Sequence, residues 1–429
     1  MGVYLWDNHF QAKVGYDLST CQMALTKSDR DLRLAEATDH LPPWLRSVLA
    51  IPDRQSALET AVNDLITLGR AGALDKEGAF ALAMLEPIRS GRNPAGSSSY
   101  SDLGLSGPPD PRIVYQRIED GRDAWWDREY LKEIDLLSPS QEILYVGTAE
   151  GDPRNRKLAM RAILSRGAIW GLVGVGLFFI PTVFRAFRSA LKSKDVGYVG
   201  HWPLPLGLGV FLLAYLASIG FGDLINQMIA GSWGGEDRPV ALSPQLYAIL
   251  DATTRFVPPL VALGFLFRKA GHATSRLGLT AKPQVGLVLG VFAMLVIVDQ
   301  VLQQTIAGAE VSDPAGGLSA TESGIWGLVL AVTSACIAAP IAEEILFRGV
   351  LFRTLANRLR VPVATLLSSA VFAVVHFYGA YGLISVAVIG VACALCFASS
   401  GRLATAILLH ALYNSAIKLP EWIVYHAPL

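Results

Sequence analysis

The sequence predicts an all-α fold: a polytopic membrane bundle of about eight transmembrane helices behind a small soluble, mainly helical N-terminal region. Of the 429 residues, 52% are hydrophobic and 17% are charged, whereas soluble domains average about 45–50% apolar and about 25% charged residues. The excess is uneven, because residues 1–160 have an ordinary polar composition and residues 167–417 contain one apolar run after another.

Charge and cysteine content exclude two other classes. Lysine and arginine (36) balance aspartate and glutamate (36), so nothing indicates nucleic acid as a partner. Four cysteines are too few and too scattered for a disulfide framework. Cys393 and Cys396 form a C-x-x-C inside an apolar run, where small packing residues are expected rather than a redox pair or metal ligands.

The polar N-terminal part shows helix signals and no catalytic signature. Ser56 and Glu59 have the spacing of a capping box, and Asp75 is a candidate cap for a second helix. An accessory or docking role is expected. Composition divides this part into a soluble helical region, a flexible linker rich in Gly, Ser and Pro, and a polar juxtamembrane region, at residues 1–91, 92–112 and 113–160.

Apolar runs near the length of a membrane span follow, since a bilayer core of about 30 Å needs about 20 apolar helical residues. N-terminal transmembrane helices are expected within residues 161–284 and a second membrane region within 285–429. The candidate segments are about 167–184, 204–221, 246–267, 285–302, 325–347, 361–377, 383–398 and 403–418. Basic residues concentrate in the first, third and fifth loops, which predicts that these loops lie in the cytoplasm.

Two adjacent carboxylates, Glu343 and Glu344, stand near the end of the fifth segment and are followed by Arg348. A charged side chain at the bilayer centre costs about 2.5–3.5 kcal/mol on insertion scales, so such residues need partners or a function. Glu344 and Arg348 are four residues apart and can pair on one helix face, whereas Glu343 points about 100° away. The spacing predicts one held carboxylate and one available for reaction; an interfacial ion pair is the structural alternative.

Three more polar side chains lie in later apolar segments: His376, His410 and Asn414. Each alone is explained by hydrogen bonding between helices, but intramembrane ionisable groups tend to meet in the bundle interior. Together they form a hydrolytic set. Glu343 could act as general base on a water molecule, and an imidazole could share the proton transfer or bind a metal. The amide and a histidine N–H could stabilise an oxyanion.

These residues form three motifs that resemble the CPBP family, which includes Ras-converting CAAX prenyl endopeptidases and bacterial abortive-infection or bacteriocin-immunity relatives. The motifs are E-E-x-x-x-R (Glu343–Arg348), F-x-x-x-H (Phe372–His376) and H-x-x-x-N (His410–Asn414). Any one is weak evidence, whereas three in order on successive apolar segments are strong. The resemblance covers about residues 285–418, within a CAAX protease-like core at 285–429, and does not reach residues 1–150.

The resemblance implies an intramembrane endopeptidase of the CAAX-processing type, in a multi-pass protein of a bacterial plasma membrane. Its partners would be the lipid bilayer and a membrane-anchored protein or peptide substrate, prenylated or not. Glu343 would activate water beside His376. His410 and Asn414 would stabilise the oxyanion. The site-orienting pair would be Glu344 and Arg348.

The resemblance leaves the metal open, because the family is described both as metalloproteases and as glutamate-dependent proteases without metal. His376, His410 and Glu343 could supply the three protein ligands that catalytic Zn²⁺ takes. The zinc-protease signature H-E-x-x-H is absent from the sequence. A metal-free mechanism is therefore favoured, no cofactor is assigned, and Zn²⁺ stays the alternative.

Two other classes of function compete with a protease. A non-catalytic membrane binding or immunity protein could use the same fold, but it would not need the whole motif set. A transporter with a proton-relay carboxylate would show repeats, and no clear internal repeat is present. Two other sets of polar residues lie in apolar segments. Asp251 and Arg255 are expected to pair with each other. Asp299 is expected at an interfacial helix end, and a position in the lining of a substrate cavity is the alternative.

Overall fold

The structure, a computed structural model, confirms the predicted fold class of a polytopic all-helical membrane bundle. It describes residues 18–92, 101, 103–133, 153–193, 202–233, 244–267, 277–306, 314, 318, 324–376 and 378–428. Within these residues every regular element is a helix. Five helices are long and apolar enough to cross a membrane: Pro153–Leu177, Leu204–Gly222, Val285–Thr305, Gly324–Ala356 and Ala380–Ser400.

Some sequence predictions fall outside this part of the chain. Part of the predicted linker at 92–112, namely residues 93–100 and 102, and most of the polar stretch after residue 133 are not among the described residues. The same holds for much of the loops whose charges predict the orientation. The linker and the orientation therefore stay predictions.

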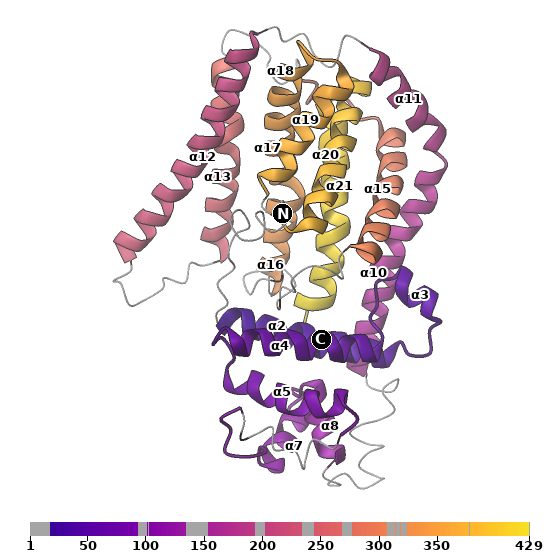
Figure 1. Cartoon of the computed structure of the whole chain (residues 1–429), viewed down its shortest axis with the longest axis vertical. Coiled ribbons are helices and arrows are strands. Elements are labelled where there is room, and N and C mark those ends of the chain that lie inside the picture. The colour runs from indigo at the N-terminus through magenta and orange to yellow at the C-terminus, as the bar shows by residue number, and fades with distance from the viewer. Residues whose placement is uncertain are drawn as a thin grey trace. The chain divides into compact units, whose positions relative to one another are not determined.

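The predicted apolar segments correspond to helices, which run side by side in Figure 1. They are α12 (Leu204–Trp233), α13 (Pro244–Leu266), α15 (Val285–Thr305), α19 (Val361–Val374), α20 (Ala380–Ser400) and α21 (Leu403–Glu421). In the membrane part, α12 packs against α13, and α20 packs against α15 and α19.

The first predicted segment differs, because two helices share it. Helix α10 (Pro153–Leu177) ends just before α11 (Ile180–Lys192) begins. Pro181 stands in the first turn of α11, where its missing N–H costs nothing but where it cannot continue a preceding helix. The ring of Phe179 at the break lies against Gly286 of α15, so that a Cβ at this glycine would come within 2.8 Å of the ring.

The fifth segment forms one continuous helical run, Gly324–Ala356. It consists of α16 (Gly324–Leu330), the π-helical η6 (Ala331–Ala338), α17 (Ala339–Glu344), the π-helical η7 (Ile345–Phe352) and α18 (Arg353–Ala356). Helix α17 packs against α13, and η7 packs against α12, α13, α19 and α20. Irregular π turns inside a helix often mark functional sites, and both π stretches here adjoin the helix that carries the two glutamates.

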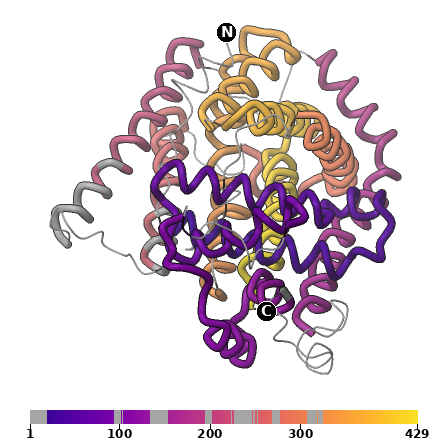
Figure 2. Tube along the Cα trace, turned by 60° about the horizontal axis from the view of Figure 1, so that its bottom comes forward, coloured from indigo at the N-terminus to yellow at the C-terminus, as the bar shows by residue number. Residues whose placement is uncertain are grey.

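Contacts divide the chain into two compact units. The second, membrane unit includes the described residues of 168–306 and 326–419. The first unit includes those of 18–167, 314, 318, 324–325 and 420–428. Its helices are α2 (Leu18–Ala37), α3 (Pro43–Val48), α4 (Arg54–Arg70), α5 (Lys76–Arg89), α7 (Pro111–Glu119) and α8 (Trp125–Glu133). Helices α2 and α4, drawn in indigo, lie side by side in both views (Figures 1 and 2). The finer division predicted from composition stays a prediction.

The C-terminal residues also belong to the first unit. The π-helical η8 (Trp422–His426) follows α21 and packs against α2. The Arg30 guanidinium donates hydrogen bonds to the carbonyls of Val424 (2.5 Å) and Ala427 (3.0 Å), and the Tyr425 hydroxyl donates to Asp31 (2.6 Å). The end of the chain is therefore held by side chains of α2.

The N-terminal caps of two helices in the first unit test the caps predicted from the sequence. Asp75 caps α5, as predicted, by accepting a hydrogen bond from the backbone N–H of Gly78 at 2.7 Å. The predicted cap at Ser56 is wrong, because α4 begins at Arg54. The carboxylate of Asp53 accepts the N–H of Ser56 at 2.9 Å, so an aspartate three residues earlier satisfies the helix start.

Two buried aspartates of the first unit have opposite electrostatic surroundings. Burial works to raise the pKa of Asp123, but Arg128, Arg33 and Arg154 outweigh it and hold that pKa below its usual range. Asp127 is fully buried. Burial raises its pKa to about 6, against weaker opposing effects of the Ala124 backbone N–H and of Arg117.

Asp127 should therefore give the first unit a measurable pH dependence. Its folded-state pKa of about 6 lies above the unfolded value of about 3.9. The neutral form thus favours folding, and this stabilisation is complete below about pH 4 and is lost as the pH rises through 6. We expect the thermal unfolding midpoint of wild type, relative to Asp127→Asn, to fall between pH 4 and pH 6. A difference that does not change with pH would contradict this, and exposed Asp39→Asn is the control.

Candidate active site

One buried carboxylate, that of Glu344, joins three helical segments of the membrane unit. Glu344 ends α17 and has no exposed surface. Its Oε1 accepts hydrogen bonds from Arg348 Nη1 at 2.7 Å and from His410 Nδ1 at 2.9 Å. The predicted pairing of Glu344 with Arg348 is confirmed, and α21 is tied to the same oxygen through His410.

Arg348 is itself held from two more sides. Its Nη2 donates to the carbonyl of Gly390 on α20 at 3.0 Å, and its guanidinium lies over the Phe372 ring of α19, 4.4 Å from the ring centre. Gly390 permits close packing of α20 against α19, because a Cβ there would come within 3.0 Å of the Cβ of Ser369. The buried charge is thus paired, hydrogen-bonded and in contact with an aromatic face, as buried guanidinium groups require.

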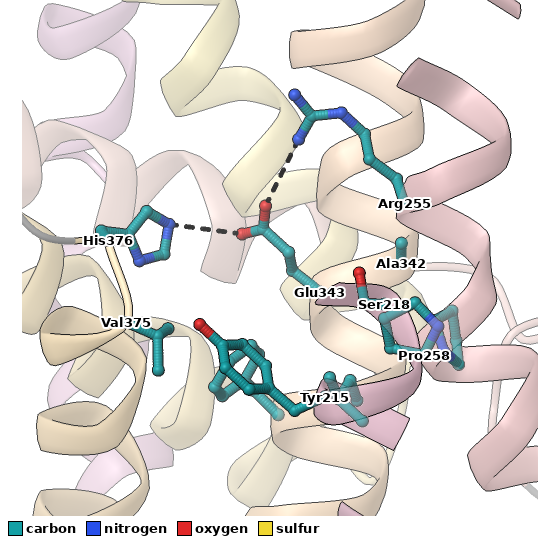
Figure 3. A pocket seen from close by; sticks show the side chains of 11 residues that line it. Tyr215, Ser218, Arg255, Pro258, Ala342, Glu343, Val375 and His376 are labelled. Carbon is teal, nitrogen blue, oxygen red and sulfur yellow. Dashed lines mark ion pairs between the residues drawn. The ribbon is translucent and has the colours of Figure 1, made fainter. Parts of the chain in front are cut away.

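Glu343 faces the other way, into a cavity of about 190 Å³. Its side chain is 24% exposed, against 0% for Glu344, so the two adjacent carboxylates have different environments. The cavity has mainly apolar walls and a few polar groups. It is lined by Tyr215, Ser218, Arg255, Pro258, Pro259, Ala342, Glu343, Leu346, Phe347, Val375 and His376 (Figure 3).

Two imidazoles approach the same oxygen of Glu343. The Nε2 atoms of His376 and His410 each lie 3.9 Å from Glu343 Oε2. In Figure 3 the ring of His376 faces the carboxylate from one side of the cavity. The structure thus brings together Glu343, His376 and His410, which the sequence places on three different segments.

The other nitrogen of each ring already has a partner. His376 Nδ1 lies 2.6 Å from the carbonyl oxygen of Phe372, which can only accept, so Nδ1 carries the hydrogen. His410 Nδ1 likewise donates to Oε1 of Glu344, the oxygen that is paired with the Arg348 guanidinium. A neutral imidazole has one N–H and one lone pair. In their neutral forms both rings therefore present an Nε2 lone pair to Glu343.

Three acceptor atoms that face one another call for a donor between them. A separation of 3.9 Å is too long for a direct hydrogen bond, but it suits a bridging water. Two hydrogen bonds of about 2.8 Å that meet at roughly a right angle span about this distance. The geometry therefore fits a water molecule hydrogen-bonded to Glu343 Oε2 and an imidazole.

The same distances test the predicted zinc ligands. Ligand atoms about 2.0–2.1 Å from a tetrahedral Zn²⁺ lie about 3.3–3.5 Å apart, so each imidazole would have to move about 0.5 Å closer to Glu343. The group of three His, Cys, Asp or Glu with ligand atoms within 4.8 Å of one another among the described residues is a different one, Glu344, Cys393 and His410. His376, His410 and Glu343 fit zinc by donor type and not by spacing.

The Glu344 group is a hydrogen-bonded network rather than a metal site. Arg348 and His410 both bond to Glu344 Oε1, and a guanidinium beside the carboxylate opposes a second cation there. The thiol of Cys393 lies toward the carbonyl of Ala406 at 3.8 Å. Cys393 and Cys396 are buried and unpaired by any disulfide, as expected for packing residues.

Asn414 lies on the same helix as His410 and is anchored to the fifth segment. Its side-chain amide donates a hydrogen bond to the backbone carbonyl of Ala335 in η6 at 2.8 Å. One of its two amide N–H groups is therefore committed to the backbone. Its oxyanion role stays a prediction.

Arg255 is the site residue that sequence reasoning missed. It was expected to pair with Asp251, whose side chain lies outside the described residues. In the structure Arg255 Nη1 lies 3.9 Å from Glu343 Oε1, and its Nε donates to the Ser334 hydroxyl at 3.1 Å. An arginine in an apolar segment is itself a signal, but its partner depends on the packing of α13 against α17.

Asp299 does not line the cavity. It accepts hydrogen bonds from the hydroxyls of Tyr381 and Ser385, both at 2.9 Å, and from Gln303 at 3.1 Å. The Ser385 hydroxyl is also bonded to the Tyr413 hydroxyl at 3.0 Å. This network joins α15, α20 and α21 and is a structural use of an intramembrane carboxylate.

Fold and site define the class: a polytopic membrane protein with a glutamate and two imidazoles around one water-sized position. Residues 325–416 match the family model of the Rce1-like type II CAAX prenyl endopeptidases. The match confirms the resemblance predicted from the sequence for this segment and supports, at the level of the family, a CAAX-type intramembrane protease. All six predicted site residues lie within the match, and Arg255 lies outside it. No curated protein and no solved structure gives a significant match.

The Glu344 network predicts a large stability effect. Arg348→Met leaves the fully buried Glu344 charge without its cation, which should cost about 3–5 kcal/mol. The thermal unfolding midpoint in detergent should therefore fall strongly, while exposed Arg358→Met, just after the same segment, should leave it nearly unchanged. The double variant Glu344→Leu/Arg348→Met, which removes both charges, should regain much of the loss. A double variant less stable than Arg348→Met would contradict this account.

Proposed function

We propose that the chain is an intramembrane endopeptidase that hydrolyses a peptide bond of a membrane-associated substrate with water activated by Glu343. The observation that carries the proposal is the 3.9 Å separation of Glu343 Oε2 from the Nε2 atoms of both His376 and His410. A carboxylate with one hydrogen-bonded water is the simplest hydrolytic unit. We place the protein in the plasma membrane of a bacterium, on the resemblance to bacterial relatives.

The reaction follows from these groups in two steps. The water oxygen attacks the peptide carbonyl carbon while its proton passes to Glu343 Oε2, and the carbonyl oxygen becomes an oxyanion. Glu343 then donates that proton to the amide nitrogen, the C–N bond breaks, and a carboxylic acid and an amine are released. The second O–H of the water is donated to the Nε2 lone pair of one of the two imidazoles, His376 or His410, which orients the water.

The walls of the cavity favour an apolar substrate. Pro258, Pro259, Phe347 and Val375 line the cavity together with Glu343, and such walls bury aliphatic side chains or a lipid chain. The proposed substrate is therefore a membrane-anchored protein or peptide. Whether it is prenylated is decided by the substrate panel below.

Replacing Glu343 with Gln tests the proposal. The purified chain in liposomes should cleave members of a panel of prenylated CAAX peptides and single-span membrane proteins, and Glu343→Gln should lower kcat by about 10²–10⁴-fold, the usual contribution of a general base. Asp299→Asn, the same change in another membrane carboxylate, should keep activity within about threefold. Equal cleavage by wild type and Glu343→Gln would contradict the proposal. Absence of cleavage would favour a non-catalytic binding or immunity protein.

A separate experiment tests whether the activity depends on a metal ion. Because the spacing around Glu343 suits water better than Zn²⁺, we expect dialysis against a chelator to leave kcat within about twofold. Loss of activity in chelator with recovery on added Zn²⁺ would instead assign His376, His410 and Glu343 as metal ligands.

A further inference from the structure

Hydrolysis at Glu343 needs a donor for the oxyanion, and the local hydrogen bonds restrict which group can supply it. In their neutral forms His376 and His410 have given their N–H groups to Phe372 and Glu344. Either ring could donate through Nε2 only as an imidazolium. Asn414 has committed one amide N–H to Ala335. The motif residues thus leave room for a donor from elsewhere.

We propose that Arg255 is a catalytic residue that stabilises the oxyanion of the tetrahedral intermediate; this inference rests on the proposed function. Arg255 Nη1 lies 3.9 Å from Glu343 Oε1, on the other side of the carboxylate from His376 (Figure 3). The oxyanion is only two bonds from the attacking water oxygen. Its donor must therefore lie beside Glu343, and the Arg255 guanidinium does.

The hydrogen bond that holds the Arg255 side chain in place supports this role. Its Nε donates to the Ser334 hydroxyl at 3.1 Å, and the side chain is 35% exposed and lines the cavity. A guanidinium has five N–H groups in a rigid fork, so it can keep Ser334 and still donate to a ligand. Ser334 neighbours Ala335, the anchor of Asn414, so one π-helical stretch positions both side chains.

Charge also favours Arg255 over the neutral donors of the cavity. Tyr215 and Ser218 carry hydroxyls there, but a hydrogen bond from a charged group to an oxyanion is roughly twice as strong as a neutral one. The guanidinium stays protonated at every working pH. Its distance from Glu343 exceeds that of a hydrogen bond, so the carboxylate remains able to take the proton from water.

A role for Arg255 in binding the substrate predicts different kinetics from a role in stabilising the oxyanion. An oxyanion donor acts mainly in the transition state, so its loss lowers kcat and leaves KM nearly unchanged. Loss of a donor that binds a substrate group in the ground state raises KM. A peptide with a phosphinate at the scissile position, which is tetrahedral and anionic, imitates the intermediate.

The test compares wild type with Arg255→Gln, Arg255→Lys and Ser334→Ala in liposomes, on a peptide that wild type cleaves. Arg255→Gln should lower kcat about 10²–10³-fold, keep KM within threefold and weaken inhibition by the phosphinate peptide by a similar factor. Arg255→Lys should recover part of kcat, and Ser334→Ala should lose less than Arg255→Gln. Unfolding midpoints in detergent check that each variant is folded.

Three results would decide against the inference. Unchanged kcat in Arg255→Gln, with wild type active, would overturn the role of Arg255 and leave the proposed function intact. A higher KM with equal loss of substrate and phosphinate affinity would make Arg255 a binding residue. Absence of cleavage by wild type across the whole panel would overturn the proposed function and this inference together.

Discussion

Glu344 places a full negative charge in the interior of an apolar bundle, and the rest of the site is arranged around that charge. Its Oε1 accepts from Arg348 and from His410 at once, and Arg348 extends the contact to Gly390 and Phe372. The helices α17, η7, α19, α20 and α21 therefore meet at one ion pair. Because an unpaired buried charge costs several kcal/mol, this network also fixes the orientation of the His410 ring and so the direction of its Nε2.

The two adjacent glutamates, Glu343 and Glu344, have different roles. Glu344 accepts two hydrogen bonds at its Oε1 and serves structure, whereas Glu343 is partly exposed to a mainly apolar cavity and has no hydrogen-bond donor closer than 3.9 Å among the site residues described here. Successive residues of a helix are rotated by about 100° about its axis, and this rotation alone gives the two side chains their different environments. The oxygens of Glu343 also differ, since one faces two imidazoles and the other faces Arg255.

The spacing of residues in the sequence predicted the contacts within one helix and the positions of the apolar helices. The i,i+4 relation predicted the Glu344–Arg348 pair, and apolar length predicted most of the helices. Spacing did not predict what depends on packing between helices: the pairing of Arg255 with Glu343, the hydrogen bond of Asn414 to Ala335, and the π-helical stretches around α17. The break at Phe179 was missed because the apolar run continues through it, although Pro181 marks it. Catalytic roles remain predictions, since geometry places residues and does not measure rates.

The central claim is that a water molecule held by Glu343 is the nucleophile. The most direct measurement is a single turnover in H₂¹⁸O with enzyme in excess, followed by mass spectrometry of the product and of the Glu343 peptide. The account predicts one ¹⁸O atom in the new C-terminal carboxylate of the product and none in Glu343. Label in the Glu343 carboxylate would mean that Glu343 itself attacks the substrate and forms an acyl-enzyme, and it would contradict the account.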